Sequence, residues 1–406
     1  MRAAVTVLTA WVSLVGGGTA WAGAGTGQVA ARLGAASRVA PGVTYRTVSW
    51  HGGHGTTHGH LLTVDLRDDR VSLDLLYPGA VGARDTVSGM TERQGAVGGV
   101  NGDFFNITEV QHPGVRETGA PVGPAVADGH ALKAAVPDGQ RFGPAMPRGV
   151  DTEAVFGVDR DGVARMDRLS LEGSVRTEDD DLPLSGFNQY AIPVDGIGVF
   201  TPAWGRVSRK RAVCGTDAHR GAPCSDETYE VTVRRGRVAA RSARPGKGPI
   251  ASGSLVLVGR EEGARELRRL AVGDRVSVDR YLRARKARGY DFAIGGFPVL
   301  RGGRQLSGLD GRTAAVRTAA GLADRGQRVY LLALDGRAAY RPGLTLTELA
   351  RLMRAVGSVD AFNLDGGGSS TLVTRSPGSG HAVVRNHPSG GAERAVANGI
   401  GVFSGS

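Results

Sequence analysis

The sequence predicts an α+β protein with a mixed, β-rich sheet core and only a few helices. Two observations support this prediction. From Val43 onward, short apolar runs are separated by polar turns, which is typical of strands. In the C-terminal third, one segment instead repeats apolar residues at helical spacing between two apolar runs, which predicts a strand-helix-strand crossover.

The N-terminus has the pattern of a secretory signal. A basic start and an apolar stretch precede Ala20-Trp21-Ala22, which fits the small-x-small rule for cleavage. We therefore expect a signal peptide over residues 1–22 and a secreted, extracellular protein. The apolar stretch is too short to span a bilayer, and no later one is long enough. The Gly/Ala-rich residues 23–42 are expected to form a flexible leader.

Strands are predicted over residues 43–50, 61–66, 71–76 and 96–100. The last of these runs directly into Asn101-Gly102-Asp103-Phe104-Phe105. Amide and acid groups beside paired aromatic rings suit a sugar site. The alternative is an ordinary strand end whose two phenylalanines belong to the core.

The middle region, about 150–290, is also β-rich. Runs 154–158 and 163–166 flank an Asp-Gly turn, and runs 230–233 and 238–241 flank a turn with Gly236, so both pairs predict hairpins. A short amphipathic stretch follows over residues 259–270.

The chain has two cysteines, Cys214 and Cys224, on either side of a polar loop. In an exported protein this spacing favours a disulfide. Two free thiols, or a zinc site completed by His219, are the alternatives.

In the C-terminal third, an apolar strand over residues 329–334 ends at Asp335. Thr345 and Glu348 then form a capping box for a helix that ends at Gly357. A second strand, 359–364, leads to Asp365. The arrangement predicts a right-handed crossover between parallel neighbours, with both aspartates at the same edge of the sheet, where α/β sheets bind ligands.

The stretch from Phe362 to Thr371 is the most informative of the chain. Asp365 follows an apolar run and precedes three glycines and three hydroxyl residues. Consecutive glycines allow backbone N–H groups to converge on an anion, beside a carboxylate that can act as acid, base or nucleophile. A tight turn between two strands is the competing interpretation. A nucleotide P-loop is excluded, because no Lys precedes the hydroxyl residues and no helix follows.

Two further stretches combine arginines with small or polar residues, 312–321 and 393–401. Arg is well suited to clamp phosphate. The chain carries 50 Lys+Arg against 39 Asp+Glu, a net charge of +11, which favours anionic partners. No basic patch interleaved with aromatic residues is present, so we expect no nucleic-acid partner.

Four histidines gather at His51, His54, His58 and His60. Their spacing matches no established ligand motif and lies in a Gly/Thr-rich turn. A solvated turn is the preferred interpretation over a transition-metal site.

Taken in order, these segments resemble the phosphodiester glycosidase domain family, which includes exported bacterial proteins. The resemblance rests on motifs at 101–105, 317–321, 335–336, 343–350, 363–371 and 394–398. It spans roughly residues 97–403, and the middle region aligns poorly. One domain over residues 43–406 is therefore expected.

The resemblance implies hydrolysis of a sugar 1-phosphodiester at the anomeric C–O bond, with an anionic glycan or sugar phosphate as substrate. Asp365 is the first candidate for nucleophile or base, and Asp103 or Asp335 for the second carboxylate. Arg317 and Arg394 would hold the phosphate. The other expected substrate contacts are Asn101, Phe104, Phe105, Thr318, Asn363, Gly366, Gly367, Gly368, Ser369, Ser370 and Asn398.

Three alternatives remain open at this point. The chain could cut the P–O bond, bind glycans without catalysis, or use calcium, which Asp and Asn oxygens suit. No cofactor is otherwise expected.

Overall fold

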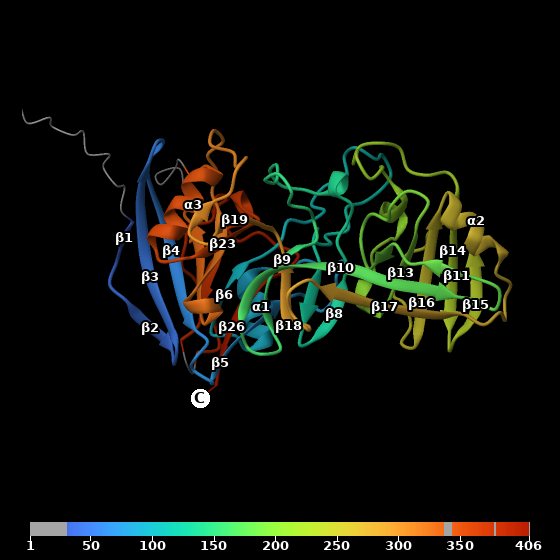
Figure 1. Cartoon of the computed structure of the whole chain (residues 1–406), viewed down its shortest axis with the longest axis horizontal. Helices are drawn as coiled ribbons and strands as arrows, with labels where there is room; N and C mark the ends of the chain where they lie inside the picture. The colour runs from blue at the N-terminus through green and yellow to red at the C-terminus, as the bar shows by residue number, and fades with distance from the viewer. Residues whose placement is uncertain (1–30, 337–342, 377–378, 406) are drawn as a thin grey trace, which may run out of the picture.

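The structure is a computed structural model that describes residues 31–336, 343–376 and 379–405. The predicted signal peptide, 1–22, lies outside these residues. The described chain forms two lobes (Figure 1), one built from the N- and C-terminal parts and one from the middle region, with β10 and β17 extending into the second lobe. The predicted β-rich character is confirmed: four sheets and three α-helices are described.

The largest sheet has nine strands and lies in the first lobe. Its spatial order is β1 (Arg32–Leu33), β3 (Val43–Gly52), β4 (Gly55–Asp65), β22 (Arg328–Leu334), β21 (Thr318–Ala323), β23 (Asp360–Leu364), β19 (Phe297–Arg301) and β20 (Arg304–Gln305), with β2 (Ser37–Ala40) paired to β3. Helix α3 (Leu346–Ala355) packs on β19 and β23 through one apolar face that includes Leu349 and Met353.

The predicted leader needs a correction. Within its described part, β1 and β2 pair antiparallel with β3, and Val39 and Ala40 are buried in the core. Backbone hydrogen bonds and this burial hold residues 32–33 and 37–40 in strands, although their composition predicted a flexible chain.

The predicted crossover also needs a correction. β22 and β23 run in the same direction, but β21 lies between them and pairs antiparallel with both. The two strands are therefore not neighbours, and Asp335 and Asp365 are separated by the width of β21. No local residue pattern indicated that β21, the strand that precedes β22 in the chain, would lie between them.

A five-stranded sheet packs against the nine-stranded sheet. Its order is β25 (Val383–Val384), β24 (Leu372–Thr374), β6 (Gly98–Asn101), β26 (Gly399–Ser404) and β5 (Val71–Leu76). Val100 and Ile400 of this sheet share one buried cluster with Leu331 and Phe362 of the other. Helix α1 (Val87–Gln94) covers β5, β6 and β24.

The middle region supplies two further sheets. One has the order β11 (Asp181–Pro183), β10 (Ala164–Arg176), β9 (Ala154–Asp159), β18 (Tyr290–Gly295), β7 (Ala125–Ala127) and β8 (His130–Lys133), with β17 (Ser277–Ala284) on β10. The other has the order β12 (Gly186–Phe187), β13 (Ile197–Phe200), β16 (Ser254–Arg260), β14 (Thr228–Arg234) and β15 (Arg237–Ser242), under helix α2 (Glu262–Arg269). Both predicted hairpins, β9–β10 and β14–β15, are confirmed.

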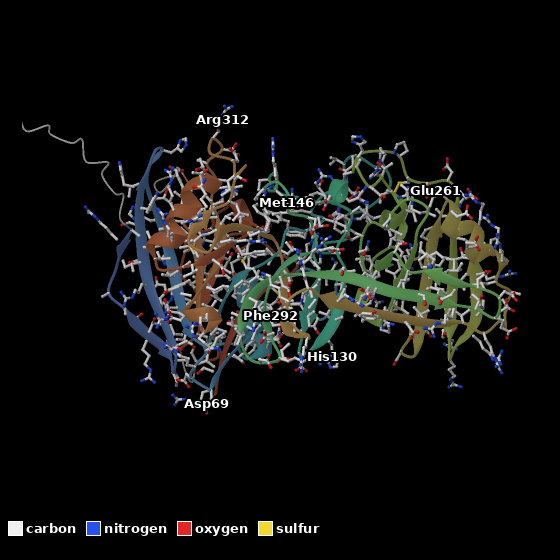
Figure 2. The ribbon with its side chains drawn as sticks, in the orientation of Figure 1. Asp69, His130, Met146, Glu261, Phe292 and Arg312 are labelled. Carbon is white, nitrogen blue, oxygen red and sulfur yellow. A yellow bond between two sulfur atoms is a disulfide. The ribbon has the colours of Figure 1, made fainter. Side chains whose placement is uncertain are left out.

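Short 3-10 turns complete the described chain: η1 (Asp138–Gln140), η2 (Pro202–Trp204), η3 (Lys210–Val213), η4 (Asp324–Gly326) and η6 (Gly367–Ser369). The predicted disulfide joins Cys214 to Cys224. Figure 2 shows Phe292 inside the molecule, whereas Arg312 and Asp69 project from its surface. No helix in the described ranges has the length and apolar character needed to cross a bilayer.

The capping box of α3 gives a test of the fold. The Thr345 hydroxyl accepts from the Glu348 N–H at 3.1 Å, and Glu348 Oε2 accepts from the Thr345 N–H at 3.0 Å. Thr345→Ala should lower the free energy of unfolding by about 1 kcal/mol, measured by urea denaturation. Thr347→Ala in the same turn is the control and should cost less, and an equal loss would contradict the cap.

Candidate functional site

The glycine segment joins two different sheets. β23 belongs to the nine-stranded sheet and β24 to the five-stranded sheet, so residues 365–371 cross from one sheet to the other. The competing interpretation, a tight turn between two strands, is right in that the segment links β23 to β24, but the two strands do not pair as a hairpin. Asp365 and the three glycines are partly exposed, whereas Ser369, Ser370 and Thr371 are buried.

Asn101 holds this crossing in place from the end of β6. Its Nδ2 donates to the Asp365 carbonyl at 2.7 Å, and its Oδ1 accepts from the Thr371 N–H at 3.0 Å. The Thr318 hydroxyl lies 2.7 Å from the same Oδ1 and 3.1 Å from the Ser370 hydroxyl. Asn101, Thr318 and Ser370 were predicted to contact substrate, but their polar atoms are used to connect the two sheets.

Asp103 lies buried immediately beyond Asn101. Its N–H donates to Asn398 Oδ1 at 2.9 Å, and its Oδ2 accepts from the Gly123 N–H at 2.6 Å. Its Oδ1 is buried and has no hydrogen-bond partner in the described part of the chain. Burial raises the pKa of Asp103, the Gly123 hydrogen bond and Lys133 oppose this rise, and the charge of Asp365 adds to it.

Lys133 is the buried cation that faces Asp103, and no sequence motif had marked it. It lies at the end of β8, fully buried, and its ammonium donates to the carbonyl oxygens of Val122, Gly123 and Ala134. Burial lowers the pKa of Lys133, and the charge of Asp103 acts in the opposite direction. A buried amine beside a buried carboxyl is a common arrangement at functional sites.

Asp365 faces Arg394 across the glycine turn. Burial raises the pKa of Asp365 to about 6, although the Ser369 hydroxyl, the Gly366 N–H at 2.9 Å and the charge of Arg394 favour the ionised form. Arg394 Nη1 lies 3.4 Å from Ser369 Oγ. A Cβ at Gly368 would come within 2.3 Å of Arg394 Nη2. The guanidinium can therefore occupy this position because residue 368 has no side chain.

Three of the four backbone N–H groups of the predicted phosphate cradle, Gly366 to Ser369, are already paired within the protein. Gly366 donates to Asp365 Oδ1, Gly367 donates to the Val316 carbonyl at 2.8 Å, and Ser369 donates to the Gly366 carbonyl at 3.1 Å. Because donors that are already paired would have to break these bonds, they are poorly suited to bind an anion.

The Arg317 backbone lies beside the glycine turn, with its Cα 3.6 Å from where a Cβ on Gly366 would be, but its guanidinium is bonded within the protein. Its guanidinium donates to the carbonyl oxygens of Leu344 and Thr313, each at 3.0 Å, and the charge of Asp310 acts on it. The cation whose charge acts on Asp365 is Arg394. Arg317 therefore connects β21 to the start of α3.

Asp335 is also engaged elsewhere. Its Oδ1 lies 3.3 Å from His60 Nε2 and 3.0 Å from His387 Nδ1, and it accepts from the His387 N–H at 2.7 Å. Burial alone would raise its pKa, but these hydrogen bonds lower it overall. The Asp365 N–H donates to the Gly102 carbonyl at 2.8 Å, which places Asp365 next to the residue that precedes Asp103, and the charge of Asp365 acts on Asp103. Asp103 and Asp365 are therefore the two neighbouring candidate carboxylates, which we call the carboxylate pair.

The two phenylalanines belong to the core. Phe104 and Phe105 are 4% and 2% exposed, and Phe104 stacks on Phe297 with ring centroids 5.9 Å apart. Their predicted role as a sugar platform is therefore wrong. Arg141, which no motif marked, lies 5.8 Å above both the Phe104 and Phe297 rings, and the charge of Asp103 acts on it.

Two buried amides near the carboxylates lack partners. Both polar atoms of the Asn363 side chain and Nδ2 of Asn398 are buried without a hydrogen bond among the residues described. Because buried amides are rarely left unpaired, each needs an explanation such as a ligand or a bound water.

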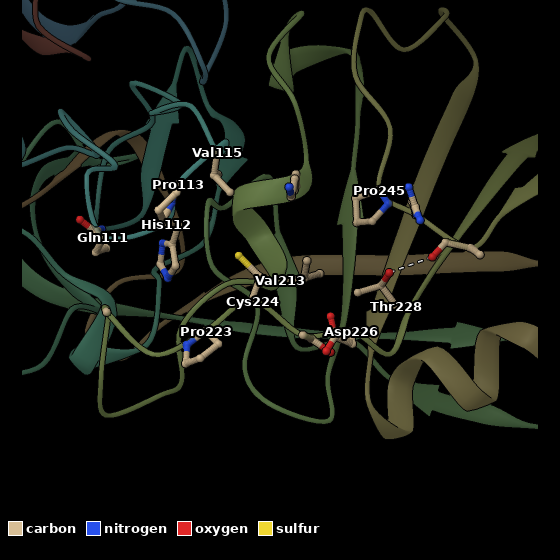
Figure 3. Close-up of a pocket in the computed structure, with 15 residues that line it drawn as sticks. Gln111, His112, Pro113, Val115, Val213, Pro223, Cys224, Asp226, Thr228 and Pro245 are labelled. Carbon is tan, nitrogen blue, oxygen red and sulfur yellow. Dashed lines mark hydrogen bonds between the residues drawn. The ribbon is translucent and has the colours of Figure 1, made fainter.

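A pocket of about 880 Å³ lies in another part of the molecule. Figure 3 shows it beside the disulfide, lined by His112, Val213, Cys224, Asp226 and Pro245 among others. Asp103, Asp335 and Asp365 do not line it. It offers no support for the predicted chemistry.

Both polar atoms of the Asn101 amide are hydrogen-bonded to backbone groups, whereas the Asn363 amide has no hydrogen bond among the residues described, and this difference can be tested. Asn101→Leu should lower the free energy of unfolding by at least about 2 kcal/mol, because two backbone groups lose their partner at about 1–3 kcal/mol each. Asn363→Leu should cost less than about 1 kcal/mol or stabilise the fold, because its amide has no hydrogen bond to lose. Equal losses in denaturant titrations would contradict these assignments.

Comparison with known proteins supports the resemblance. Residues 227–403 match the family described as Phosphodiester glycosidase. Among curated proteins, none matches the chain.

Solved structures share the fold. A putative exported protein (BPSS2145) from Burkholderia pseudomallei K96243 matches with a TM-score of 0.70 and 20% identity, over 92% of this chain and 97% of that chain. A hypothetical protein from Synechocystis matches with a TM-score of 0.67 and 22% identity, over 90% of this chain, which spans 62% of that protein.

A weaker match is the zebrafish N-acetylglucosamine-1-phosphodiester alpha-N-acetylglucosaminidase catalytic domain auto-inhibited by pro-peptide. Its TM-score is 0.45 at 15% identity, over 92% of this chain and 88% of that chain. At their identities the Burkholderia and Synechocystis structures show a shared fold alone. The resemblance to the phosphodiester glycosidase family that the motifs predicted is confirmed over residues 227–403.

Proposed function

We propose that this chain is a secreted hydrolase that cleaves the anomeric C–O bond of a sugar 1-phosphodiester. The observation that carries the proposal is the position of Asp365, whose N–H donates to the Gly102 carbonyl beside Asp103, with Arg394 Nη1 3.4 Å from Ser369 Oγ on the same glycine turn. Paired carboxylates are the usual machinery of glycoside hydrolysis. Asp365 and Arg394 both lie within the region that matches the phosphodiester glycosidase family.

The two carboxyl groups have environments that suit different roles. Asp365 is partly exposed, and with a pKa of about 6 it is largely ionised at neutral pH, which suits a nucleophile or base. Asp103 is buried, and both its burial and the charge of Asp365 favour its protonated form, which suits an acid. The leaving group is a phosphate monoester, which needs less protonation than an ordinary alcohol.

Arg394 is the proposed phosphate ligand, in place of Arg317. Its guanidinium is at the exposed side of the glycine turn and beside the ionisable Asp365. Arg141, close to Asp103, is proposed as a second positive group. Guanidinium groups can hold the phosphate while positive charge develops at the anomeric carbon.

Asn363 and Asn398 are proposed to bind sugar hydroxyls. Their unpaired amide atoms are buried close to the carboxylate pair, and Asn398 already holds the backbone of Asp103. A hydroxyl-rich ligand would satisfy these groups.

The pH dependence follows from Asp365. Because Asp365 must be ionised and Asp103 protonated, kcat/KM should increase about tenfold per pH unit below pH 6 and fall again above about pH 7, where Asp103 loses its proton. Asp365→Asn should lower kcat by at least about a hundredfold. A rate that is independent of pH between 4 and 7 would exclude Asp365 as the base.

The same residue predicts a change in stability. Its folded pKa of about 6 lies above its ordinary value of 3.8, so its favourable contribution is complete below pH 3.8 and is lost as the pH rises through 6. Asp365→Asn should therefore raise the melting temperature relative to the parent chain at pH 7.5 but not at pH 3.5. An equal effect at both pH values would argue against the raised pKa.

The two arginines form a matched pair for testing the phosphate contact. Arg394→Ala should lower kcat/KM for a sugar-1-phosphate ester by at least about a hundredfold, with little loss of stability because the residue is exposed. Arg317→Ala should instead lower stability, since its guanidinium bonds two carbonyls in the protein. The reverse pattern would return the phosphate role to Arg317.

The bond that is cut can be identified with oxygen-18 water. Label in the released sugar supports cleavage at the anomeric carbon, and label in the phosphate would show cleavage of the P–O bond instead. Binding of the ester without turnover would show a protein that binds glycans without catalysis.

A further inference from the structure

Three side chains outside the carboxylate pair converge on one point. His60 comes from β4, Asp335 follows β22, and His387 lies in the segment after β25. One ligand-type atom from each lies within 4.8 Å of the others. In the sequence, His60 lies close to His51, His54 and His58. Of these four histidines, only His60 belongs to the three-residue group found in the described part of the chain.

We propose that His60, Asp335 and His387 form a binding site for a divalent transition metal of the zinc class. Two imidazole nitrogens and one carboxylate oxygen are a ligand set found in zinc sites that keep an open position. Calcium is disfavoured, because it prefers oxygen ligands throughout.

The distances suit such an ion. Asp335 Oδ1 lies 3.3 Å from His60 Nε2 and 3.0 Å from His387 Nδ1. With metal–ligand bonds of about 2.0–2.2 Å in a tetrahedron, neighbouring ligand atoms lie roughly 3.3 Å apart. The metal would replace the protons that now lie between these atoms.

The surroundings orient the ligands. The Tyr45 hydroxyl lies 2.7 Å from His60 Nδ1, and its ring stacks on the imidazole with centroids 5.9 Å apart. Metal-binding histidines usually use their second nitrogen in this way.

The backbone also holds the ligands. The Asp335 N–H donates to the His58 carbonyl at 2.9 Å, and the Gly336 N–H donates to the His387 carbonyl at 2.7 Å. The buried Asn386 donates to the carbonyls of Leu334 and Ser370. Leu334 directly precedes the proposed ligand Asp335, and Ser370 belongs to the glycine segment.

The site has an entry route. The side chains of His60 and Asp335 are 9% and 5% exposed, whereas that of His387 is 41% exposed. His387 also lines a surface cavity of about 250 Å³. An ion can therefore enter beside His387 and keep water as a further ligand.

The metal would fasten the 386–389 segment to the nine-stranded sheet. The Ser389 hydroxyl donates to the Gly367 carbonyl at 3.2 Å, so this segment supports the glycine turn from behind. The site is thus a structural neighbour of the proposed catalytic residues, and its existence does not depend on the proposed function.

The test is titration of the chelator-treated full chain with ZnCl2 by calorimetry, and with CoCl2 by visible absorption. One Zn²⁺ per chain should bind, and Co²⁺ should give a ligand-field spectrum. Tyr45→Phe should weaken Zn²⁺ binding roughly 10- to 100-fold, and His387→Gln should weaken it further.

His51→Gln is the matched control, because His51 is exposed on β3 and hydrogen-bonded to Thr56 rather than to this cluster. It should bind Zn²⁺ as tightly as the parent chain. His387 is partly exposed, so His387→Gln should keep its circular dichroism spectrum and melting temperature without metal. The proposal is overturned if the parent chain binds no Zn²⁺, or if folded His387→Gln binds it unchanged.

Discussion

The side chain of Asn101 connects the two packed sheets on which the site depends. One amide joins the end of β6 to the carbonyl of Asp365, the N–H of Thr371 and the hydroxyl of Thr318. These polar groups lie between two apolar layers, so any of them left without a hydrogen bond would lower the stability of the fold. These bonds hold the segment that carries Asp365, whose N–H also donates to the carbonyl of Gly102, the residue before Asp103.

Around this connection the protein buries charge, which a core normally excludes. Asp103 and Lys133 are both fully enclosed, and each shifts the protonation of the other. Such groups are retained only where their surroundings pair them, and they are concentrated at sites where protons move. Several buried polar atoms at this place also lack a hydrogen-bond partner in the described chain. They are Oδ1 of Asp103, both amide atoms of Asn363, and Nδ2 of Asn398.

The arginines show how one residue type serves two purposes in the same protein. Arg317 sits among small residues that resemble a binding motif, but its donors bind the carbonyls before α3. Arg394 has fewer internal partners and lies over Gly368, where the absence of a side chain leaves it room. Burial and hydrogen bonding therefore distinguish the structural arginine from the one that is available for ligand.

Local patterns determined the strands of the two hairpins, the capped helix α3 and the Cys214–Cys224 pair, and they marked Asp103, Asp365 and Arg394 as candidate site residues. These features depend on residues close together in the chain, where turn, capping and periodicity rules act. Tertiary structure alone decided that β21 lies between β22 and β23 and that Phe104 and Phe105 are buried in the core. It also decided that the charges of Lys133 and Arg141 interact with Asp103, and that His60 and His387 meet Asp335. Those outcomes depend on how sheets pack and on which polar groups burial leaves without water, and neither is encoded in a short window of sequence.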